Sequence, residues 1–254
     1  MTKAAKKITA TRLVNRTRPA LEPRAATQKS PITRRSVVRR DSAATRERIL
    51  GVAMSEFSTH GYSGGRVDRI SRKARVNVRM IYHYFGNKDA LYLAVLERSY
   101  LSIREREQTL DVDGVDAIYG MRKLIELTFD FLATDPHFAR LIIGENLMMG
   151  KMVQKSKIIP QMTRPLLLKL HSILKRGQEQ NLFHRTIDAE SLYISILGLC
   201  FIHVSNRHTL GTMFQRNFAD QQWLKKRKAV VSDLLVSYLT RVDQDPTSIG
   251  HHRR

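Results

Sequence analysis

The stretch NVRMIYHYFGNKDAL, residues Asn77–Leu91, sets aromatic side chains beside basic ones. If it forms a helix, Ile81 and Phe85 fall on one face at the four-residue spacing of a buried stripe. Arg79 and His83 then fall on another face of the same helix. The pattern predicts a short helix that packs into a core with one face and offers the other to a polyanion.

Helical patterns also precede this stretch. In ATRERILGVAMSEF the apolar residues recur at helical spacing as far as Phe57, and Asp41 or Ser42 is expected to cap the helix. The segment HGYSGG ends that helix, and RVDRISRKA predicts a second, short one. With the turn at residues 75–77, the three helices predict a helix-turn-helix unit, with its motif at about residues 67–86.

Two asparagines mark the starts of the next two helices. The side-chain oxygen of Asn77 can accept a hydrogen bond from a backbone amide two or three residues later, and Asn87 can act in the same way. Lys88 then stands in a first turn, where a cation opposes the helix dipole by about 0.3–1 kcal/mol. A bound phosphate would reverse that effect. The alternative is a solvated lysine balanced by Asp89.

The first turn of the third helix is the part that a recognition helix inserts deepest into the major groove. Arg79 is therefore predicted to donate to guanine O6 or N7, and Val78 to contact a thymine methyl group. Tyr82 is expected at the boundary of the core, with its hydroxyl group outward.

A motif of another class lies in the same region. Gly61-Tyr62-Ser63-Gly64-Gly65 matches G-x-S-x-G, the nucleophile elbow of serine hydrolases. That elbow needs a buried strand before it and a helix after it. Here an amphipathic helix precedes the motif, so a flexible turn is expected, and a hydrolase centred on Ser63 remains an alternative.

The segment HGYSGGRVDRISRKARVNVRMIYHYFGNKDALYLAVL resembles the DNA-binding domain of TetR-family transcriptional regulators. The resemblance covers about residues 43–103. It is carried by Phe57, Gly61-Tyr62, Val67, Ile70, Ala74, Val76, the run Ile81–Phe85, Lys88 and Leu91. Together with the pattern above it predicts a set of DNA contacts: Arg66, Val78, Arg79, Met80, Tyr82, His83, Tyr84 and Lys88.

Three positions depart from the family pattern. Gly65 replaces the usual threonine before the second helix, and Arg75 replaces the usual glycine of the turn. Arg75 is therefore expected to need a positive φ or a different turn. Arg79 and Met80 are also unusual where they stand, so the family's base preference cannot be transferred.

The charge of the chain supports a polyanionic partner. The 254 residues carry a formal net charge of +21. Residues 1–40 hold 12 basic residues and one acidic residue, hence +11, which leaves 21 − 11 = +10 for the rest. Double-stranded DNA is the predicted partner, and a nonspecific nucleic-acid-binding protein is the alternative. Residues 1–41 are predicted to be a disordered basic arm, and residues 243–254 a tail.

The chain shows no sign of secretion or membrane insertion. Its N-terminus has no apolar signal core, and its longest apolar run is too short for a membrane span. Cys200 is the single cysteine and lies in an apolar run, which indicates a buried thiol in a reducing compartment. We expect a cytoplasmic protein without a membrane partner.

The C-terminal half is predicted to be helical as well, which makes the chain all-α. No segment alternates with a two-residue period, and Pro165 and Gly177 suit a helix start and a helix end. Residues 104–242 are therefore interpreted as one helical domain. Its expected helices cover residues 116–134, 136–150, 152–177, 188–206 and 219–241.

The helix at 188–206 is apolar nearly all round, and the helix at 219–241 carries a second apolar stripe. Pairing both helices with a symmetric copy would bury these surfaces in a four-helix bundle, so a homodimer is predicted. The segment GQEQNLFHRTIDAE resembles the family segment before its last two helices. The family generally dimerises through those helices and binds an effector among the others.

An unknown small-molecule effector is accordingly expected in this domain. Seven residues are candidate contacts because they combine polar or large apolar side chains with the predicted helices: His137, Arg140, Glu145, Asn146, Met149, His171 and Phe201. The nine histidines are scattered, so no metal site is predicted, and no cofactor is expected.

The sequence thus predicts a ligand-responsive dimeric regulator that is not an enzyme. A repressor that releases a palindromic operator when its effector binds is the favoured form, ahead of an activator.

Overall fold

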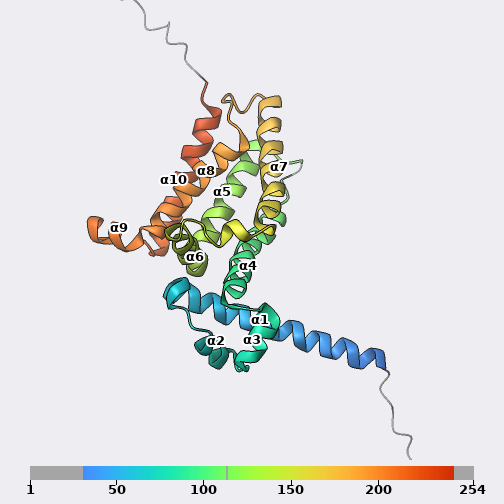
Figure 1. Ribbon diagram of the computed structural model, residues 1–254. Helices are drawn as coiled ribbons and strands as arrows, with labels where there is room; N and C mark the ends of the chain where they lie inside the picture. The colour runs from blue at the N-terminus through green and yellow to red at the C-terminus, as the bar shows by residue number, and fades with distance from the viewer. Residues whose placement is uncertain (1–30, 113, 243–254) are drawn as a thin grey trace, which may run out of the picture. The chain divides into compact units, whose positions relative to one another are not determined.

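The computed structural model describes residues 31–112 and 114–242, with side chains from Asp41 onward. All regular elements of these described residues are helices, which confirms the all-α prediction (Figure 1). The elements are α1 Pro31–Gly64, α2 Val67–Ala74, α3 Val78–Phe85, α4 Lys88–Gln108, α5 Ala117–Thr134, α6 Pro136–Leu147, the 3-10 helix η1 Val153–Lys155, α7 Ile158–Glu179, α8 Ala189–Ser205, α9 Arg207–Phe214 and α10 Gln221–Thr240. The described residues from Ser42 onward form one compact unit.

Helix α1 begins earlier than predicted. It starts at Pro31, so Asp41 and Ser42 lie inside the helix instead of capping it. The prediction of an unstructured arm is wrong for residues 31–41, and its remaining part lies outside the described residues, as does the predicted tail. Proline suits a first helical turn, and neither proline nor glycine follows it before Gly51. The glycine-containing break is confirmed at Gly61, where φ is 68°.

Helices α1 to α4 enclose the predicted core of the helix-turn-helix unit. Ile81 and Phe85 are buried together with Phe57 and Ile70, as their spacing indicated. The edge of the Phe57 ring meets Tyr92 of α4 at a centroid distance of 5.0 Å. Burial of each such side chain contributes about 1.5–3 kcal/mol, which explains how two eight-residue helices can be held in place.

Two of the departures from the family pattern, Gly65 and Arg75, lie in the turns on either side of α2. A Cβ atom at Gly65 would overlap the Phe57 ring, so the core leaves no room for the usual threonine. Arg75 adopts a left-handed conformation with φ 51° and ψ 47°, as its position in the turn requires. For an L-residue with a Cβ atom, that conformation costs about 1–2 kcal/mol.

The C-terminal domain is built around α5, which packs against α7, α8 and α10 (Figure 1). Helix α4 connects the two halves, because its C-terminal part packs against α5 and α7. Aspartates cap the last two long helices: Asp188 accepts from the amide of Ser191, and Asp220 from that of Trp223. Local capping chemistry therefore defines these helix starts, as it does at Asn77 and Asn87.

Three expectations for this domain need correction. Pro165 lies inside α7 and not at its start, because α7 begins at Ile158. The predicted helix at 152–177 consequently starts late, after η1. Helix α9 was not predicted, because the chain bends sharply at Asn206 and turns into a separate eight-residue helix.

The hydropathy of α8 and α9 bears on membrane insertion. Among the described residues, no single helix is both long enough and apolar enough to cross a bilayer. Helices α8 and α9 together have the length and composition of a membrane span, but the two are bent by 69° relative to each other.

Candidate nucleic-acid interface and ligand cavity

The outer face of α3 is formed by Arg79, Tyr82 and His83, which share one side of the helix and are exposed. Asn77 caps the helix by accepting a hydrogen bond from the amide of Arg79 at 2.9 Å. Met80 is 41% exposed at the edge of this face. The structure thus brings Arg79, Tyr82 and His83 together at the free side of α3, whereas Val78, the other predicted reader of bases, is partly buried against the core.

Two of the predicted contact residues are partly engaged within the protein. The Tyr84 hydroxyl lies 3.0 Å from the hydroxyl of Ser42. The Lys88 ammonium donates to the carbonyl of Ser63 at 3.4 Å and lies over the ring of Tyr62, 4.8 Å from its centroid. Lys88 therefore has a protein partner at the start of α4, where a phosphate contact was predicted.

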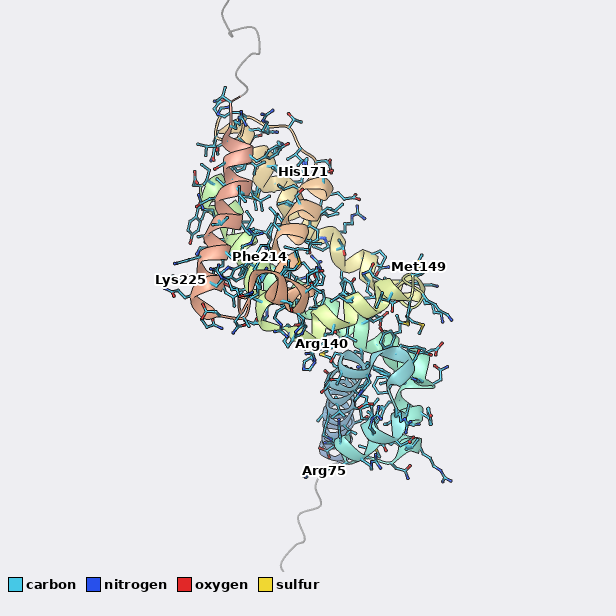
Figure 2. The ribbon with its side chains drawn as sticks, turned by 90° about the vertical axis from the view of Figure 1, so that its left-hand side faces the viewer. Arg75, Arg140, Met149, His171, Phe214 and Lys225 are labelled. Carbon is cyan, nitrogen blue, oxygen red and sulfur yellow. The ribbon has the colours of Figure 1, made fainter. Side chains whose placement is uncertain are left out.

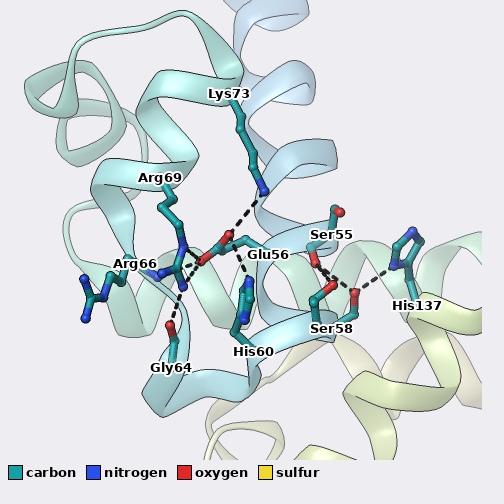
Figure 3. Close-up of polar contacts among 10 residues, drawn as sticks. Ser55, Glu56, Ser58, His60, Gly64, Arg66, Arg69, Lys73 and His137 are labelled. Atoms are coloured by element: carbon teal, nitrogen blue, oxygen red, sulfur yellow. Dashed lines mark hydrogen bonds and ion pairs between the residues drawn. The ribbon is translucent and has the colours of Figure 1, made fainter.

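The start of α2 is held by Glu56 of α1 (Figure 3). Its buried carboxylate accepts from the Arg66 amide at 3.1 Å and forms an ion pair with Arg69 at 2.6 Å. Lys73 and His60 approach the same carboxylate at 3.6 and 3.9 Å. Burial alone would raise the pKa of Glu56, but the hydrogen bonds from Arg69 and Arg66 outweigh it and lower this pKa.

The role of Glu56 in holding α2 was not predicted from the sequence. A glutamate within an amphipathic helix normally faces solvent, and nothing local shows that basic residues of α2 will surround it. Glu56 accepts from the amide of Arg66, the residue before α2, and so fixes the start of this helix, which has no side-chain cap of its own. The Arg66 side chain remains exposed.

A cavity of about 500 Å³ lies in the C-terminal domain. Its walls come from α4, α5, α6, α7 and α8 and are mainly apolar: Tyr100, Ile103, Arg104, Leu132, Phe138, Ile142, Thr163, Tyr193, Ile194, Leu197, Gly198, Phe201, Ile202 and Ser205. A cavity of this size and lining is typical of small-molecule sites.

A buried polar cluster lies at one part of the cavity wall. Arg104 donates from Nη1 to Glu107 at 2.6 Å and from Nη2 to the hydroxyl of Tyr193 at 2.9 Å. Burial raises the pKa of Glu107 to about 7 despite the nearby Arg104. Burial likewise raises the pKa of Tyr193 to about 12, so this hydroxyl keeps its proton. Arg104 and Tyr193 thus bring one cation and one hydroxyl group to the cavity, whereas Glu107 pairs with Arg104 without lining the cavity itself.

Comparisons with known proteins match both halves of this architecture. Residues 49–95 match the model described as "Bacterial regulatory proteins, tetR family", and residues 118–235 match "Tetracyclin repressor-like, C-terminal domain". The HTH-type transcriptional repressor NicS of Pseudomonas putida is 35% identical over 78% of this chain and 93% of its own length. The chain belongs to the TetR family.

Other similar proteins agree with this assignment. The HTH-type transcriptional repressor SCO4008 of Streptomyces coelicolor is 38% identical over 43% of this chain and 54% of its own length. A solved tetR-family regulator from Rhodococcus RHA1 has the same fold, with a TM-score of 0.61, 17% identity, and coverage of 78% of this chain and 98% of that one. The protein is thus a DNA-binding transcriptional regulator, and neither alternative class is supported.

The hydrolase alternative fails on geometry as well as on family. In this TetR-family chain the segment Gly61–Gly65 closes α1 and follows a helix, whereas a nucleophile elbow follows a strand. TetR-family members are regulators and not enzymes, and Ser63 is an exposed residue at the C-terminal end of α1. Among residues 31–112 and 114–242, no group of three or more His, Cys, Asp or Glu side chains could hold a metal ion.

Of the seven predicted effector contacts, only Phe201 lines the cavity. Arg140, Met149 and His171 lie on the outside of the domain (Figure 2). Asn146 is exposed and donates to the carbonyl of Ile142. The prediction chose these residues by side-chain type within the expected helices, whereas the cavity is lined by helices that are distant in sequence.

The remaining two candidates have structural partners. Nδ1 of His137 lies 2.7 Å from the hydroxyl of Ser58 in α1 (Figure 3). Glu145 is buried and accepts from the amides of Met152 and Val153, which holds the turn after α6. Both residues connect α6 with neighbouring segments instead of facing the cavity.

The TetR-family chain also exposes apolar side chains on α8 and α10. Ile194 and Ile202 of α8 are 61% and 45% exposed. Val230, Leu234 and Tyr238 recur on one side of α10 and are about half exposed. Cys200 is buried as predicted, and burial raises the pKa of its thiol to about 12.

Proposed function

We propose that the protein is a dimeric, ligand-responsive repressor. It binds a palindromic operator in the bacterial cytoplasm through α3 and releases it when a small molecule fills the cavity. The observation that carries this proposal is the double role of α6. Phe138 and Ile142 of α6 line the cavity, while Leu141 belongs to the core of the helix-turn-helix unit. The name of the NicS repressor supports the same assignment.

The contacts of α6 indicate how a ligand would affect DNA binding. His137 hydrogen-bonds with Ser58 of α1, and α1 packs on the helices that carry the DNA-contact residues. A ligand that moves Phe138 or Ile142 therefore shifts a helix that is attached to the DNA-binding half. Such a ligand lowers operator affinity only by as much as it prefers the shifted arrangement.

The DNA contacts that we propose follow from the exposed face of α3. Arg79 reads base edges, and the partly buried Val78 beside it contacts a thymine methyl group. Tyr82 and His83 contact the backbone or adjacent bases, and Met80 lies at the rim. Arg66 at the start of α2 contacts phosphate. Tyr84 and Lys88 join these contacts only if they exchange their present protein partners for DNA.

Footprinting on the DNA that flanks the protein's own gene tests this proposal. Protection of one palindrome is expected, whereas uniform protection would indicate nonspecific binding. Arg79→Ala should weaken binding to the palindrome by about 1–3 kcal/mol and relax the choice of one base pair. Arg164→Ala removes an equally exposed arginine from α7 and serves as the control. Equal effects of the two substitutions would contradict the assignment of Arg79.

The dimer is proposed to form through α8 and α10, because their exposed apolar side chains need a cover. Leu234→Glu places a charge in the middle of that surface, so it should convert the dimer to a monomer in sedimentation velocity. Gln222→Glu adds the same charge at an exposed position near the start of α10 and should leave the dimer intact. A wild-type monomer at micromolar concentration would contradict the proposal.

A further inference from the structure

The cavity has a single cation among its lining residues. The side chain of Arg104 is 6% exposed, and its ion pair with Glu107 leaves further donor positions free for other partners. One of them donates to Tyr193, while Nε is buried and has no hydrogen-bond partner within the described part of the chain. A buried guanidinium with unused donor capacity gains most from an acceptor that carries negative charge.

Tyr193 extends this donor group into the cavity. Its hydroxyl oxygen accepts from Arg104, so its own hydrogen is available to a second acceptor. Tyr193 and Arg104 both line the cavity, whose other walls are largely aliphatic and aromatic side chains. The site therefore combines one polar end with a long apolar remainder.

We propose that the cavity binds an apolar monocarboxylic acid. Its carboxylate accepts from the Tyr193 hydroxyl beside Arg104, and its hydrocarbon part fills the space between α6 and α8. That this ligand is the effector rests on the proposed function. That the cavity binds it does not depend on the proposed function.

Other ligand classes fit this site less well. A cationic ligand would be repelled by Arg104, and a neutral one would leave the charged donor without a new partner. A dianion would bring a second charge into apolar walls, where desolvation is costly. The monoanion is the class for which the cavity offers one charge and one directed donor.

The ligand anion adds a second negative charge beside Arg104, and Glu107 responds to it. The charged groups that act on Glu107 are Arg104 of α4 and Lys169 of α7, and Glu107 itself acts on Tyr193 of α8. Because the pKa of Glu107 is already about 7, a nearby anion raises it further, and the carboxyl group takes up a proton from solvent. The ligand binds as an anion together with one proton.

Calorimetric titration of the full chain without DNA tests the proposal with decanoate, decan-1-ol and decylammonium as probes. Decanoate should bind at least tenfold more tightly than the alcohol (~1.4 kcal/mol) and more tightly still than the ammonium. Above neutral pH its affinity should fall by up to about tenfold per pH unit, because Glu107 must then acquire its proton. Titrations in two buffers of different ionisation enthalpy should report proton uptake of up to one per site.

Two conservative substitutions assign the effect to the named atoms. Tyr193→Phe should weaken decanoate binding about tenfold, whereas Tyr119→Phe, on the exposed side of α5, should have no effect. Glu107→Gln should keep or strengthen decanoate binding and abolish its dependence on pH and buffer. Glu105→Gln alters an exposed carboxylate on the same helix and should retain the wild-type behaviour.

Several outcomes would overturn the proposal. Decan-1-ol binding as tightly as decanoate would remove the role of Arg104, and wild-type binding without proton uptake would remove that of Glu107. Equal losses in both tyrosine variants would mean nonspecific hydrophobic binding. Absence of decanoate binding in a preparation that still protects the palindrome would reject this ligand class while leaving the repressor function standing.

Discussion

Two buried glutamates, one in each half of the molecule, differ in their state of charge. Glu56 and Glu107 are 0% and 3% exposed. The carboxylate of Glu56 is surrounded by Arg69, Lys73 and the Arg66 amide, and its pKa is lowered. The pKa of Glu107 is raised to about 7 by burial, which its partner Arg104 only partly offsets.

The difference shows that burial alone does not decide ionisation. Hydrogen bonds and cations that converge on one carboxylate keep its pKa low, whereas the cations near Glu107 offset the effect of burial only in part. In the DNA-binding half the fixed charge of Glu56 ties α2 to α1. In the cavity half, Glu107 can change its charge when a ligand arrives.

The largest expected effect follows from loss of the charge at Glu56. Glu56→Gln leaves Arg69 and Lys73 without their buried partner and should lower the free energy of unfolding by about 2–3 kcal/mol, less than for a fully buried pair because both cations are partly exposed. Urea denaturation near neutral pH measures this change. Glu47→Gln, at an exposed position of α1, should change stability by less than about 0.5 kcal/mol.

The sign of the pH dependence sharpens this test. Because the folded-state pKa of Glu56 is lowered, its contribution is present above the ordinary glutamate value of 4.5 and is lost as pH falls through the folded-state pKa. The stability gap between wild type and Glu56→Gln should therefore narrow in acid. A gap that does not depend on pH would mean that the substitution destabilises the protein through the shape of the amide side chain and not through the lost charge.

A smaller effect of opposite sign is expected at Glu107. Its raised pKa stabilises the folded protein fully below the ordinary value of 4.5, and this contribution is lost as pH rises to about 7. Between these values, wild type should lose up to about 1.4 kcal/mol per pH unit relative to Glu107→Gln. Urea denaturation at about pH 6 and about pH 7 measures the difference, which is at most about 1.4 kcal/mol over that interval.

The control for this prediction is Glu105→Gln, which alters an exposed carboxylate in the same helix. It should track wild type at both pH values. A stability difference between wild type and Glu107→Gln that stays constant over this range would show that Glu107 is ionised throughout, as Glu56 is.

The smallest effect concerns the turn of the DNA-binding half. Arg75→Gly relieves the left-handed conformation of an arginine and should raise stability by about 1 kcal/mol. Thermal unfolding measures this change. Arg72→Gly, one turn earlier within α2, should instead lower stability by about 1 kcal/mol. A loss of stability in Arg75→Gly would show that the arginine side chain contributes more than its backbone costs.

Much of the DNA-binding half could be predicted because its signals are local. Asn77 and Asn87 cap the helices that they were expected to cap. Ile81 and Phe85 follow the helical period and are buried, and Arg79 and His83 are exposed on the other side. Helix caps and a four-residue period involve neighbours in the chain, so they can be recognised without knowing the fold.

The cavity of the C-terminal domain could not be predicted from such local signals. Its cavity draws walls from five helices, and only Phe201 of the predicted contacts reaches it. Arg104 was not singled out, because an arginine in REREQ normally belongs to a solvated helix face. Its buried guanidinium donates to Tyr193, which lies 89 residues further along the chain.

The sequence by itself determined the class of the protein, the helix-turn-helix unit and the face of α3 that is free to meet DNA. Tertiary structure alone decided which polar side chains are enclosed, where the cavity lies, and why one buried glutamate is charged while another is poised to titrate. The reason is physical: periodicity and capping act over a few residues, whereas burial and electrostatics depend on atoms that only the folded chain brings together.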